Sequence, residues 1–399
     1  MTLPPTGPRI LLFTGKGGVG KSTIASGTAA LAAATGRRTL VLSTDSAHSL
    51  ADAFGIEVGS EPTPVADNLF VQHIDAQARF ERSWADIQSY LLSVLTVAGV
   101  DSVSAEELTI LPGAEEIFAL LELRERALEG AWDVVVVDCA PTAETLRLLA
   151  MPEALGWYMQ RLFGLQRSLV ASLRPVLTRA TGMPLPGTAF FEALQRLHGE
   201  LEEVRTLLSG PRASIRVVLT PERMVVAEAR RAYTTLSLFG YRVDGVVANR
   251  VFPEVATGPR DSWRDGWVDA QRGVLADVEA SFSGLSIWRA AYLPGEPAGV
   301  TALRSLATEL YGADDPFAEP EAGPPLRITS SDRGAVLHLS LPLAGRRDVD
   351  LARTGDELVV TVGSYRRLLS LPASLSRHQV SAARLEQGEL QVRFHEVSV

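Results

Sequence analysis

The sequence predicts an α/β fold with a mainly parallel sheet flanked by helices and helical insertions, followed by a small antiparallel β-sandwich. The first observation is a short apolar run at residues 9–14 that ends in a glycine-rich stretch and continues into an alanine-rich helical pattern. The second is the recurrence of similar short runs along the chain. The third is a change after residue 325, where apolar residues alternate with period two.

The N-terminal pattern predicts one strand–helix–strand unit. A helix is expected from Lys21 to Thr35, with Gly36 ending it, and a second buried strand at 39–43. A unit of this length implies a parallel sheet. Later β-branched runs, each followed by turn or helix signals, predict further strands. These runs are WDVVVVD (132–138), IRVVLT (215–220) and DGVVANR (244–250), with a weaker candidate at 286–292.

Two helical insertions interrupt this pattern, at about residues 76–130 and 150–210. Apolar residues in the segment 80–95 keep helical spacing, and those in 155–173 cover most of the helix circumference. A helix that is apolar around most of its circumference must be covered by other groups. Core packing, a groove for an apolar ligand or client, and a dimer interface remain open as explanations.

The C-terminal part has its own organisation. Residues 1–312 form the expected α/β domain, residues 313–325 read as an acidic, proline-rich linker, and residues 326–399 as the sandwich. Apolar residues alternate with polar ones in three stretches of this last part, which indicates short antiparallel strands. The alternating residues are Leu337, Leu339, Leu341, Leu358, Val360, Val362, Leu390, Val392 and Phe394.

Composition excludes several classes of protein. The chain has 399 residues, a net charge of −9 and a pI near 5.3, which argues against nucleic-acid binding through the overall charge. It has one cysteine, Cys139, so an intrachain disulfide and a multi-cysteine metal site within one chain are both excluded. We find neither a signal-peptide pattern nor a membrane-length apolar run, and therefore expect a cytoplasmic protein.

The glycine-rich stretch carries a phosphate-binding motif. Gly15, Gly20, Lys21 and Ser22 satisfy G-x-x-x-x-G-K-[ST] between a predicted strand and a predicted helix. Glycines let backbone N–H groups face phosphates, Lys21 suits the β and γ phosphates, and the Ser22 hydroxyl suits Mg²⁺. We therefore expect ATP and Mg²⁺ here. The nucleotide-binding residues are Gly15, Lys16, Gly17, Gly18, Val19, Gly20, Lys21, Ser22 and Thr23.

Two aspartates follow predicted strands near this loop. Asp45 comes after the run at 39–43, and Asp138 ends the run at 132–138. Ligands of open α/β sheets bind at the carboxyl ends of the strands, so both aspartates should face the phosphates. Asp138 suits the second coordination shell of Mg²⁺, and Asp45 could orient the attacking water. A helix N-cap or a turn is the alternative role for each.

Four stretches together carry a family resemblance. GKGGVGKST resembles the deviant Walker A loop of dimeric ATPases, in which a lysine also precedes the usual one. STDSAHSL (43–50), DCAPTAETLRLL (138–149) and ILPGAEEIFALLEL (110–123) are similar to the two switches and the intervening helix of the arsenite-pump and tail-anchored-protein-targeting ATPases. The resemblance covers residues 9 to about 312. It implies switch loops made of Asp45, Ser46, Ala47, His48, Asp138, Cys139, Ala140, Pro141 and Thr142.

The resemblance implies a homodimer with two ATP molecules at its interface. Lys16 would then reach the nucleotide of the partner subunit, so that hydrolysis depends on dimer closure. Asn249 and Pro294 correspond to positions that contact adenine in the family; a strand-end turn is the alternative role for Asn249. The tail resembles the small α-crystallin-type sandwich fused to some bacterial and chloroplast members, with client contact or dimer support as its implied role.

The sequence departs from its relatives at several positions. Ser46 and Ser49 replace the Pro and Asn frequent in the first switch, and Cys139 replaces a Thr in the second. Cys139 is expected to be a small buried residue, with a redox switch as the alternative. Residues 260–271 lack the C-x-x-C pair with which eukaryotic targeting factors share zinc, so zinc is not expected. One cysteine also excludes a bridging iron–sulfur cluster and the several thiols of an arsenite site.

These features favour an ATP-hydrolysing homodimeric switch that captures and releases a hydrophobic client. The alternative is the catalytic ATPase subunit of an anion or arsenite-type efflux system. A membrane- or DNA-positioning ATPase is disfavoured, because the chain is acidic and ends in a β module. We expect at most transient membrane association.

Overall fold

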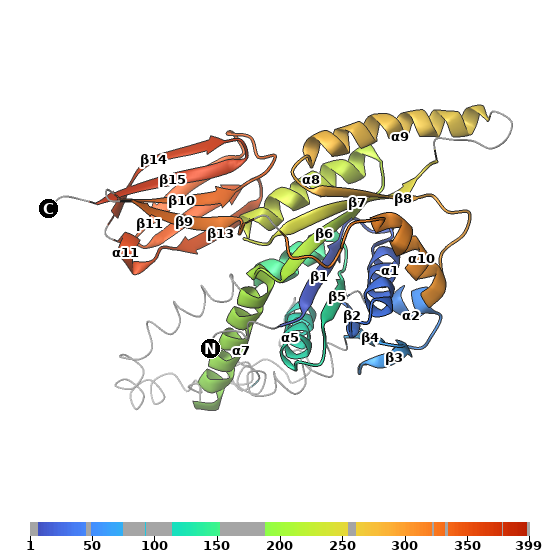
Figure 1. Ribbon diagram of the computed structural model, residues 1–399. Helices are drawn as coiled ribbons and strands as arrows, with labels where there is room; N and C mark the ends of the chain where they lie inside the picture. The colour runs from blue at the N-terminus through green and yellow to red at the C-terminus, as the bar shows by residue number, and fades with distance from the viewer. Residues whose placement is uncertain are drawn as a thin grey trace. The chain divides into compact units, whose positions relative to one another are not determined.

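The computed structural model describes residues 7–44, 49–74, 92, 114–151, 188–253, 261–320, 323–331, 334–376 and 378–396. The chain divides into two units. One comprises residues 1–73, 130–146 and 208–399, and the other residues 74–129 and 147–207. The first unit contains the large sheet and the C-terminal strands (Figure 1).

The large sheet has eight strands in the order β3-β4-β2-β5-β1-β6-β7-β8. All neighbouring pairs are parallel except β3 and β4. The strands are β1 (Arg9–Thr14), β2 (Thr39–Ser43), β3 (Thr63–Ala66), β4 (Leu69–His73), β5 (Val134–Asp138), β6 (Ala213–Leu219), β7 (Val243–Val251) and β8 (Ser286–Ala291). The helices named in the same unit are α1 (Lys21–Ala34), α2 (Ser49–Phe54), α8 (Arg223–Leu238), α9 (Ser262–Ser281) and α10 (Val300–Tyr311).

The core lies on both faces of the central strands. Every residue of β1, β2, β5 and β6 is buried, as expected for a parallel sheet covered on both sides. Figure 1 shows α1 and α10 on one side of the sheet and α8 and α9 on the other. Gly27 of α1 allows α10 to approach closely, because a Cβ there would lie 2.7 Å from the Leu303 carbonyl oxygen. The predicted α/β fold is therefore confirmed.

The hairpin of β3 and β4 is an element that the sequence pattern did not predict. Its turn places Asn68 at φ 60°, a left-handed conformation that asparagine tolerates better than most residues. β4 pairs with β2 in parallel and adds a strand to the expected sheet. β3 alternates between half-buried and exposed residues, so it is an edge strand with little apolar signal.

The C-terminal strands form two antiparallel sheets, in the orders β14-β15-β10-β9 and β11-β12-β13. Their shared core contains eight of the nine residues singled out by the period-two pattern, and the ninth, Val362, packs against it. The antiparallel prediction is therefore confirmed. The strands are β9 (Leu326–Ser331), β10 (Gly334–Ser340), β11 (Val349–Thr354), β12 (Glu357–Val362), β13 (Tyr365–Ser370), β14 (His378–Glu386) and β15 (Glu389–Glu396), with a short helix α11 (Ala373–Ser376).

The end of α8 contributes to the core of the sandwich. Leu238 is fully buried within the same apolar cluster as the strands of the sandwich. Arg367 of β13 is buried and donates a hydrogen bond to the Leu238 carbonyl oxygen. A cation at the C-terminus of a helix satisfies an unpaired carbonyl group and complements the helix dipole. The ring of Phe239 meets that of Tyr365 edge-on, 6.5 Å between centroids.

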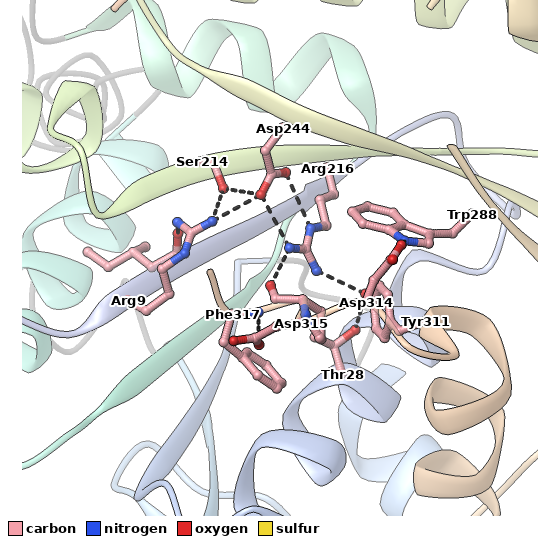
Figure 2. Close-up of polar contacts among 12 residues, drawn as sticks. Arg9, Thr28, Ser214, Arg216, Asp244, Trp288, Tyr311, Asp314, Asp315 and Phe317 are labelled. Carbon is pink, nitrogen blue, oxygen red and sulfur yellow. Dashed lines mark hydrogen bonds and ion pairs between the residues drawn. The ribbon is translucent and has the colours of Figure 1, made fainter. Parts of the chain in front are cut away.

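The segment expected to be a linker begins with residues fixed to the sheet (Figure 2). Arg216 of β6 is fully buried and donates hydrogen bonds to the Tyr311 hydroxyl and the Pro316 carbonyl oxygen. Asp314 accepts a hydrogen bond from the Trp288 indole, 2.9 Å away. Phe317 is buried. The anchored part of the chain therefore extends to residue 317, five residues beyond the expected boundary at 312.

The second unit is described through two helices, α5 (Ala114–Leu128) and α7 (Thr188–Ser209). Arg124 of α5 donates a hydrogen bond to Glu203 of α7 over 2.7 Å. The helical pattern at 80–95 and the apolar stretch at 155–173 lie outside the described residues. Within the described part of the chain, no helix is both long enough and apolar enough to cross a bilayer.

Candidate nucleotide-hydrolysis site

The phosphate-binding loop lies between the central strand β1 and α1. Its glycines are required by geometry: a Cβ at Gly15 would lie 2.1 Å from the Val218 carbonyl oxygen, and one at Gly20 would lie 2.3 Å from the Asn249 amide nitrogen. Gly20 is also the N-cap of α1 with φ 91°, and it carries no side chain to cap the helix. The first backbone N–H groups of α1 are therefore available to an anion.

The two lysines of the loop have different surroundings. Lys21 is the first residue of α1, is buried, and donates a hydrogen bond to the Lys16 carbonyl oxygen over 3.3 Å. Lys16 is only half-buried. Among the described residues, no hydrogen bond or ion pair holds its ammonium group. Lys21 therefore points within its own loop, and Lys16 carries a charge at the loop surface.

The end of β5 packs directly against the loop. Asp138 is the last residue of β5, is fully buried, and lies in register with Phe13 of β1. The backbone N–H of Thr142 donates to the Gly15 carbonyl oxygen over 3.2 Å. The predicted second switch thus begins at the phosphate loop and returns to it four residues later.

Thr44 connects the ends of β2 and β5. Its backbone N–H donates to the Asp138 carbonyl oxygen over 3.0 Å, and its hydroxyl accepts from the Ala140 N–H over 3.2 Å. Thr44 directly precedes Asp45, the start of the predicted first switch. One residue therefore joins the beginnings of the two predicted switches.

Cys139 is a buried, weakly acidic thiol. Burial raises the pKa of the Cys139 thiol well above its usual range, and the Asp138 carboxylate raises it further, while Lys21 opposes the rise. The thiolate is the form that reacts and binds soft metals, so this environment disfavours both.

A pocket of about 310 Å³ adjoins the loop. It is lined by Gly20 and Thr23 from the loop and α1, by Asn249 from β7, and by the segment from Tyr292 to Pro297 that follows β8. Parallel pairing places the ends of β7 and β8 side by side, and Tyr292 N donates to the Val251 carbonyl oxygen. The predicted base contacts Asn249 and Pro294 therefore line one pocket beside the loop.

The Asn249 side chain is held at both ends. Its amide nitrogen donates to the Val19 carbonyl oxygen of the loop over 2.8 Å, and its carbonyl oxygen accepts from the Arg250 N–H over 2.9 Å. These two bonds fix the orientation of the amide. Because an amide nitrogen has two N–H groups, one donor remains after the bond to Val19.

The structure brings most of the predicted site together at the carboxyl ends of β1, β5 and β7. The predicted residues that it describes are Gly15, Lys16, Gly17, Gly18, Val19, Gly20, Lys21, Ser22, Thr23, Asp138, Cys139, Ala140, Pro141, Thr142, Asn249 and Pro294. Asp45, Ser46, Ala47 and His48 lie outside the described residues.

The sequence pattern missed three residues of the site. Arg250 lines the pocket with φ 58°, Tyr292 lines it from the end of β8, and Thr44 connects the two switches. Thr44 directly precedes Asp45, Arg250 directly follows Asn249 and Tyr292 lies two residues before Pro294, so proximity to predicted positions is the signal that could have indicated them. Their role depends on which strand ends are neighbours.

The central strand, glycine loop, helix and buried aspartate define a P-loop nucleoside-triphosphatase. Residues 8–312 match the family described as anion-transporting ATPase, and residues 332–394 match the HSP20-like domain found in ArsA. The chain therefore belongs to the anion-transporting ATPase family and is an ATPase.

Curated relatives are similar along most of the chain. A putative arsenical pump-driving ATPase of Chlorobaculum tepidum is 35% identical over 92% of this chain and 91% of its own length. A second protein of that name, from Aquifex aeolicus, is 34% identical over 96% and 98%. The ATPase ASNA1 homolog of Trypanosoma cruzi is 27% identical, and the match covers 75% of this chain and 91% of that protein.

Proposed function

We propose that the protein is a homodimeric, ATP-driven switch that holds a hydrophobic client in its ATP-bound form and releases it on hydrolysis. The observation that supports this most is the pair of lysines, with Lys21 directed into its own loop and Lys16 at the loop surface. ATPases of this type are generally dimeric. A surface cation beside the phosphates is well placed to serve a nucleotide held by a second subunit.

The hydrolytic roles follow from charge and position. Lys21 stabilises the β and γ phosphates, and Lys16 of one subunit stabilises the charge that develops on the phosphoryl group held by the other. Asp45 orients the attacking water. The products are ADP and phosphate.

Oxygen donors of the site suit Mg²⁺. Ser22 is half-buried in the first turn of α1, and Asp138 is buried at the adjacent strand end. Hydroxyl and carboxylate oxygens are ligands that Mg²⁺ prefers, and it commonly keeps several waters. Ser22 would hold the ion directly and Asp138 through water, and the ion would neutralise charge on the phosphate oxygens.

The client part of the proposal rests on the apolar sequence at 155–173 and on the resemblance to tail-anchored-protein-targeting ATPases. In this scheme, residues 1–312 are the ATPase domain, 313–325 connect it to the sandwich, and 326–399 support the dimer or contact the client. ATP can favour client binding only as far as the client binds the two nucleotide states with different affinity.

The second candidate is the driving subunit of an arsenite-type efflux system. The names of the relatives from Chlorobaculum tepidum and Aquifex aeolicus favour it. The buried, weakly acidic Cys139 thiol is the chain's single thiol and is poorly suited to bind a metalloid.

Capture of a peptide by an ATP-trapped protein tests the proposal. We expect Asp45→Asn protein with ATP to retain a labelled apolar helical peptide of about 20 residues, and the same protein with ADP to release it. Lys21→Ala should bind no nucleotide and capture nothing. Lys16→Ala should bind ATP normally yet hydrolyse it at least about 100-fold more slowly, the scale of a lost electrostatic stabiliser.

Different results contradict different parts of the proposal. Equal capture with ATP and ADP would exclude a nucleotide-driven client cycle. Hydrolysis at the wild-type rate by Lys16→Ala would exclude its action on the partner's nucleotide. Arsenite stimulation of hydrolysis in both wild type and Cys139→Ser would favour the efflux role.

A further inference from the structure

Both lysine side chains of this protein lie in the phosphate-binding loop. The chain has 38 lysines and arginines, and only Lys16 and Lys21 are lysines. A guanidinium group keeps its charge and resists acylation, whereas the amine of a lysine is a nucleophile once it loses its proton and is the usual target of acetylation. Acylation of a side-chain amine in this chain is therefore confined to the loop.

The two amines differ in how accessible they are. Lys21 is 6% exposed, and its Nζ donates to the Lys16 carbonyl oxygen over 3.3 Å. Lys16 is half-buried, and within the part of the chain that the structure describes its ammonium group has no hydrogen-bond or ion-pair partner. The next two residues, Gly17 and Gly18, are exposed, and a Cβ at either would meet no atom within 4 Å. A small molecule can therefore approach the amine of Lys16 more easily than that of Lys21.

The loop offers a site for phosphoryl anions beside this amine. Gly20 caps α1 without a side chain, so the first N–H groups of α1 are available to an anion. The Lys21 Nζ lies against the Lys16 carbonyl oxygen, so an anion held by Lys21 is within reach of the flexible four-carbon side chain of Lys16. An acyl phosphate is a phosphoryl anion that carries an activated acyl group. When its phosphate group binds in the loop, its acyl carbon is held near the Lys16 amine, and such proximity accelerates a reaction.

We propose that Lys16 is acylated by small acyl phosphates, and that the loop itself positions the reagent. The Lys16 amine, after losing one proton to water, attacks the acyl carbon. The bond between that carbon and the phosphate oxygen breaks, and phosphate leaves with the bonding electrons. The nitrogen gives its second proton to the phosphate, so the products are an amide and inorganic phosphate. Lys21 and the backbone N–H groups of the loop stabilise the leaving phosphate.

Acylation of Lys16 switches off hydrolysis, a consequence that rests on the proposed function of this residue. The amide is neutral, so the positive charge of Lys16 is lost. Lys21 keeps its charge, and ATP still binds. The phosphoryl group held by the partner subunit then lacks its stabilising cation. Because ATP and an acyl phosphate occupy the same loop, bound ATP protects Lys16, and acylation selects the nucleotide-free protein.

Mass spectrometry of the full-length protein treated with acetyl phosphate tests the inference. We expect one acetyl group at Lys16 and little at Lys21. Saturating ATP or inorganic phosphate should slow this labelling at least about tenfold, because the loop is then occupied and the reagent loses the advantage of proximity. N-acetoxysuccinimide transfers the same acetyl group but contains no phosphate, so inorganic phosphate should change its rate of labelling at Lys16 far less.

Two variants separate delivery by the loop from the reactivity of the amine. Lys21→Ala keeps the Lys16 amine but weakens phosphate binding, so labelling by acetyl phosphate should slow while labelling by N-acetoxysuccinimide continues. Circular dichroism checks that this variant is folded. Lys16→Arg keeps a positive charge at the same position and should lose the acetyl group with both reagents, because a guanidinium group is not acylated.

The outcomes distinguish this inference from the proposed function. Acetylated wild-type protein should bind ATP as before and hydrolyse it about 100-fold more slowly, the scale of a lost electrostatic stabiliser. Labelling mainly at Lys21, or acetyl-phosphate labelling of Lys16 that neither inorganic phosphate nor Lys21→Ala slows, would overturn the inference and leave the proposed function standing. Protein acetylated at Lys16 that hydrolyses ATP at the wild-type rate would support the acylation site and contradict the role of Lys16 in the proposed function.

Discussion

Asn249 lines the pocket beside the glycine-rich loop and bonds to that loop through a single amide. Its carbonyl oxygen is occupied by the Arg250 N–H, and one of its N–H groups by the Val19 carbonyl oxygen. The remaining N–H is a donor, so it can bind only a hydrogen-bond acceptor on the ligand. A purine presents a suitable acceptor at N7, which pyrimidines lack.

We therefore predict that Asn249 reads the N7 atom of ATP. Wild-type protein should have a KM for 7-deaza-ATP about 2- to 10-fold above that for ATP, which corresponds to one hydrogen bond of roughly 0.5–1.5 kcal/mol. Asn249→Ala should raise both KM values and bring their ratio close to one. The ratio is the measurement, because loss of the Val19 contact also disturbs the loop. An unchanged ratio in Asn249→Ala would assign the N7 contact to another residue.

For individual residues, the sequence predicted site residues that are close together in the chain. It did not predict those that come together only through the fold. Gly15, Gly20, Lys21 and Ser22 belong to one contiguous motif, so the local sequence indicates a nucleotide site. The Thr44 hydroxyl, by contrast, accepts a hydrogen bond from the N–H of Ala140, which is 96 residues away in the chain. Their meeting depends on β2 being paired with β5, and local sequence carries no information about strand order.

The strands and helices of the first unit are joined by a buried ionic cluster (Figure 2). Asp244 of β7 accepts from Arg9 of β1 over 3.0 Å and from Arg216 of β6 over 3.2 Å. Ser214 donates to the same carboxylate over 2.7 Å. Burial lowers the pKa of Arg9 to about 10, and the charge of Asp244 opposes this shift. The Asp244 carboxylate thus forms ion pairs with two buried guanidinium groups.

Removal of that carboxylate should be costly. We predict that Asp244→Asn lowers the free energy of unfolding by roughly 3–5 kcal/mol, because two buried guanidinium groups lose their counter-charge. Urea denaturation measures the loss. Glu202→Gln is the matched control: Glu202 pairs with Arg205 over 3.4 Å, but both side chains are about 40% exposed, so the change should stay below about 1 kcal/mol. Similar losses of unfolding free energy in the two variants would show that burial does not determine how much these ion pairs stabilise the protein.

Elements with a strong apolar signal were predicted, whereas the polar contacts that hold the segment after α10 have no counterpart in the local sequence. Runs such as Val134–Asp138 are apolar enough to be recognised as buried strands. The segment from Asp314 to Phe317 is acidic and rich in turn formers, so it resembles a linker. Arg216 of a distant strand holds it through the Pro316 carbonyl oxygen. Every residue has a backbone carbonyl group, so the local sequence gives no sign that this contact forms.

The whole chain combines an ATPase with a sandwich that relatives do not all share. The match to the Trypanosoma cruzi relative covers nearly all of that protein but only three quarters of this chain, whereas the Chlorobaculum tepidum match covers more than nine tenths of both. In this chain, Leu238 of α8 lies in the core of the sandwich. α8 begins at Arg223, just after the end of β6 beside the phosphate loop. One helix therefore connects the nucleotide edge of the sheet to the sandwich.

This connection predicts that the two parts unfold together. Arg367→Ala leaves the buried Leu238 carbonyl oxygen without its charged donor, which should cost about 1.5–3 kcal/mol and separate one urea transition into two. Arg366→Ala removes the neighbouring, exposed arginine and should keep the single transition. Tryptophan emission and far-ultraviolet circular dichroism follow the ATPase and the whole chain respectively, because the chain has no tryptophan after Trp288. Two transitions already present in wild-type protein would mean that the sandwich folds independently of α8. A single, shifted transition in Arg367→Ala would mean that other contacts between α8 and the sandwich are enough to make the two parts unfold together.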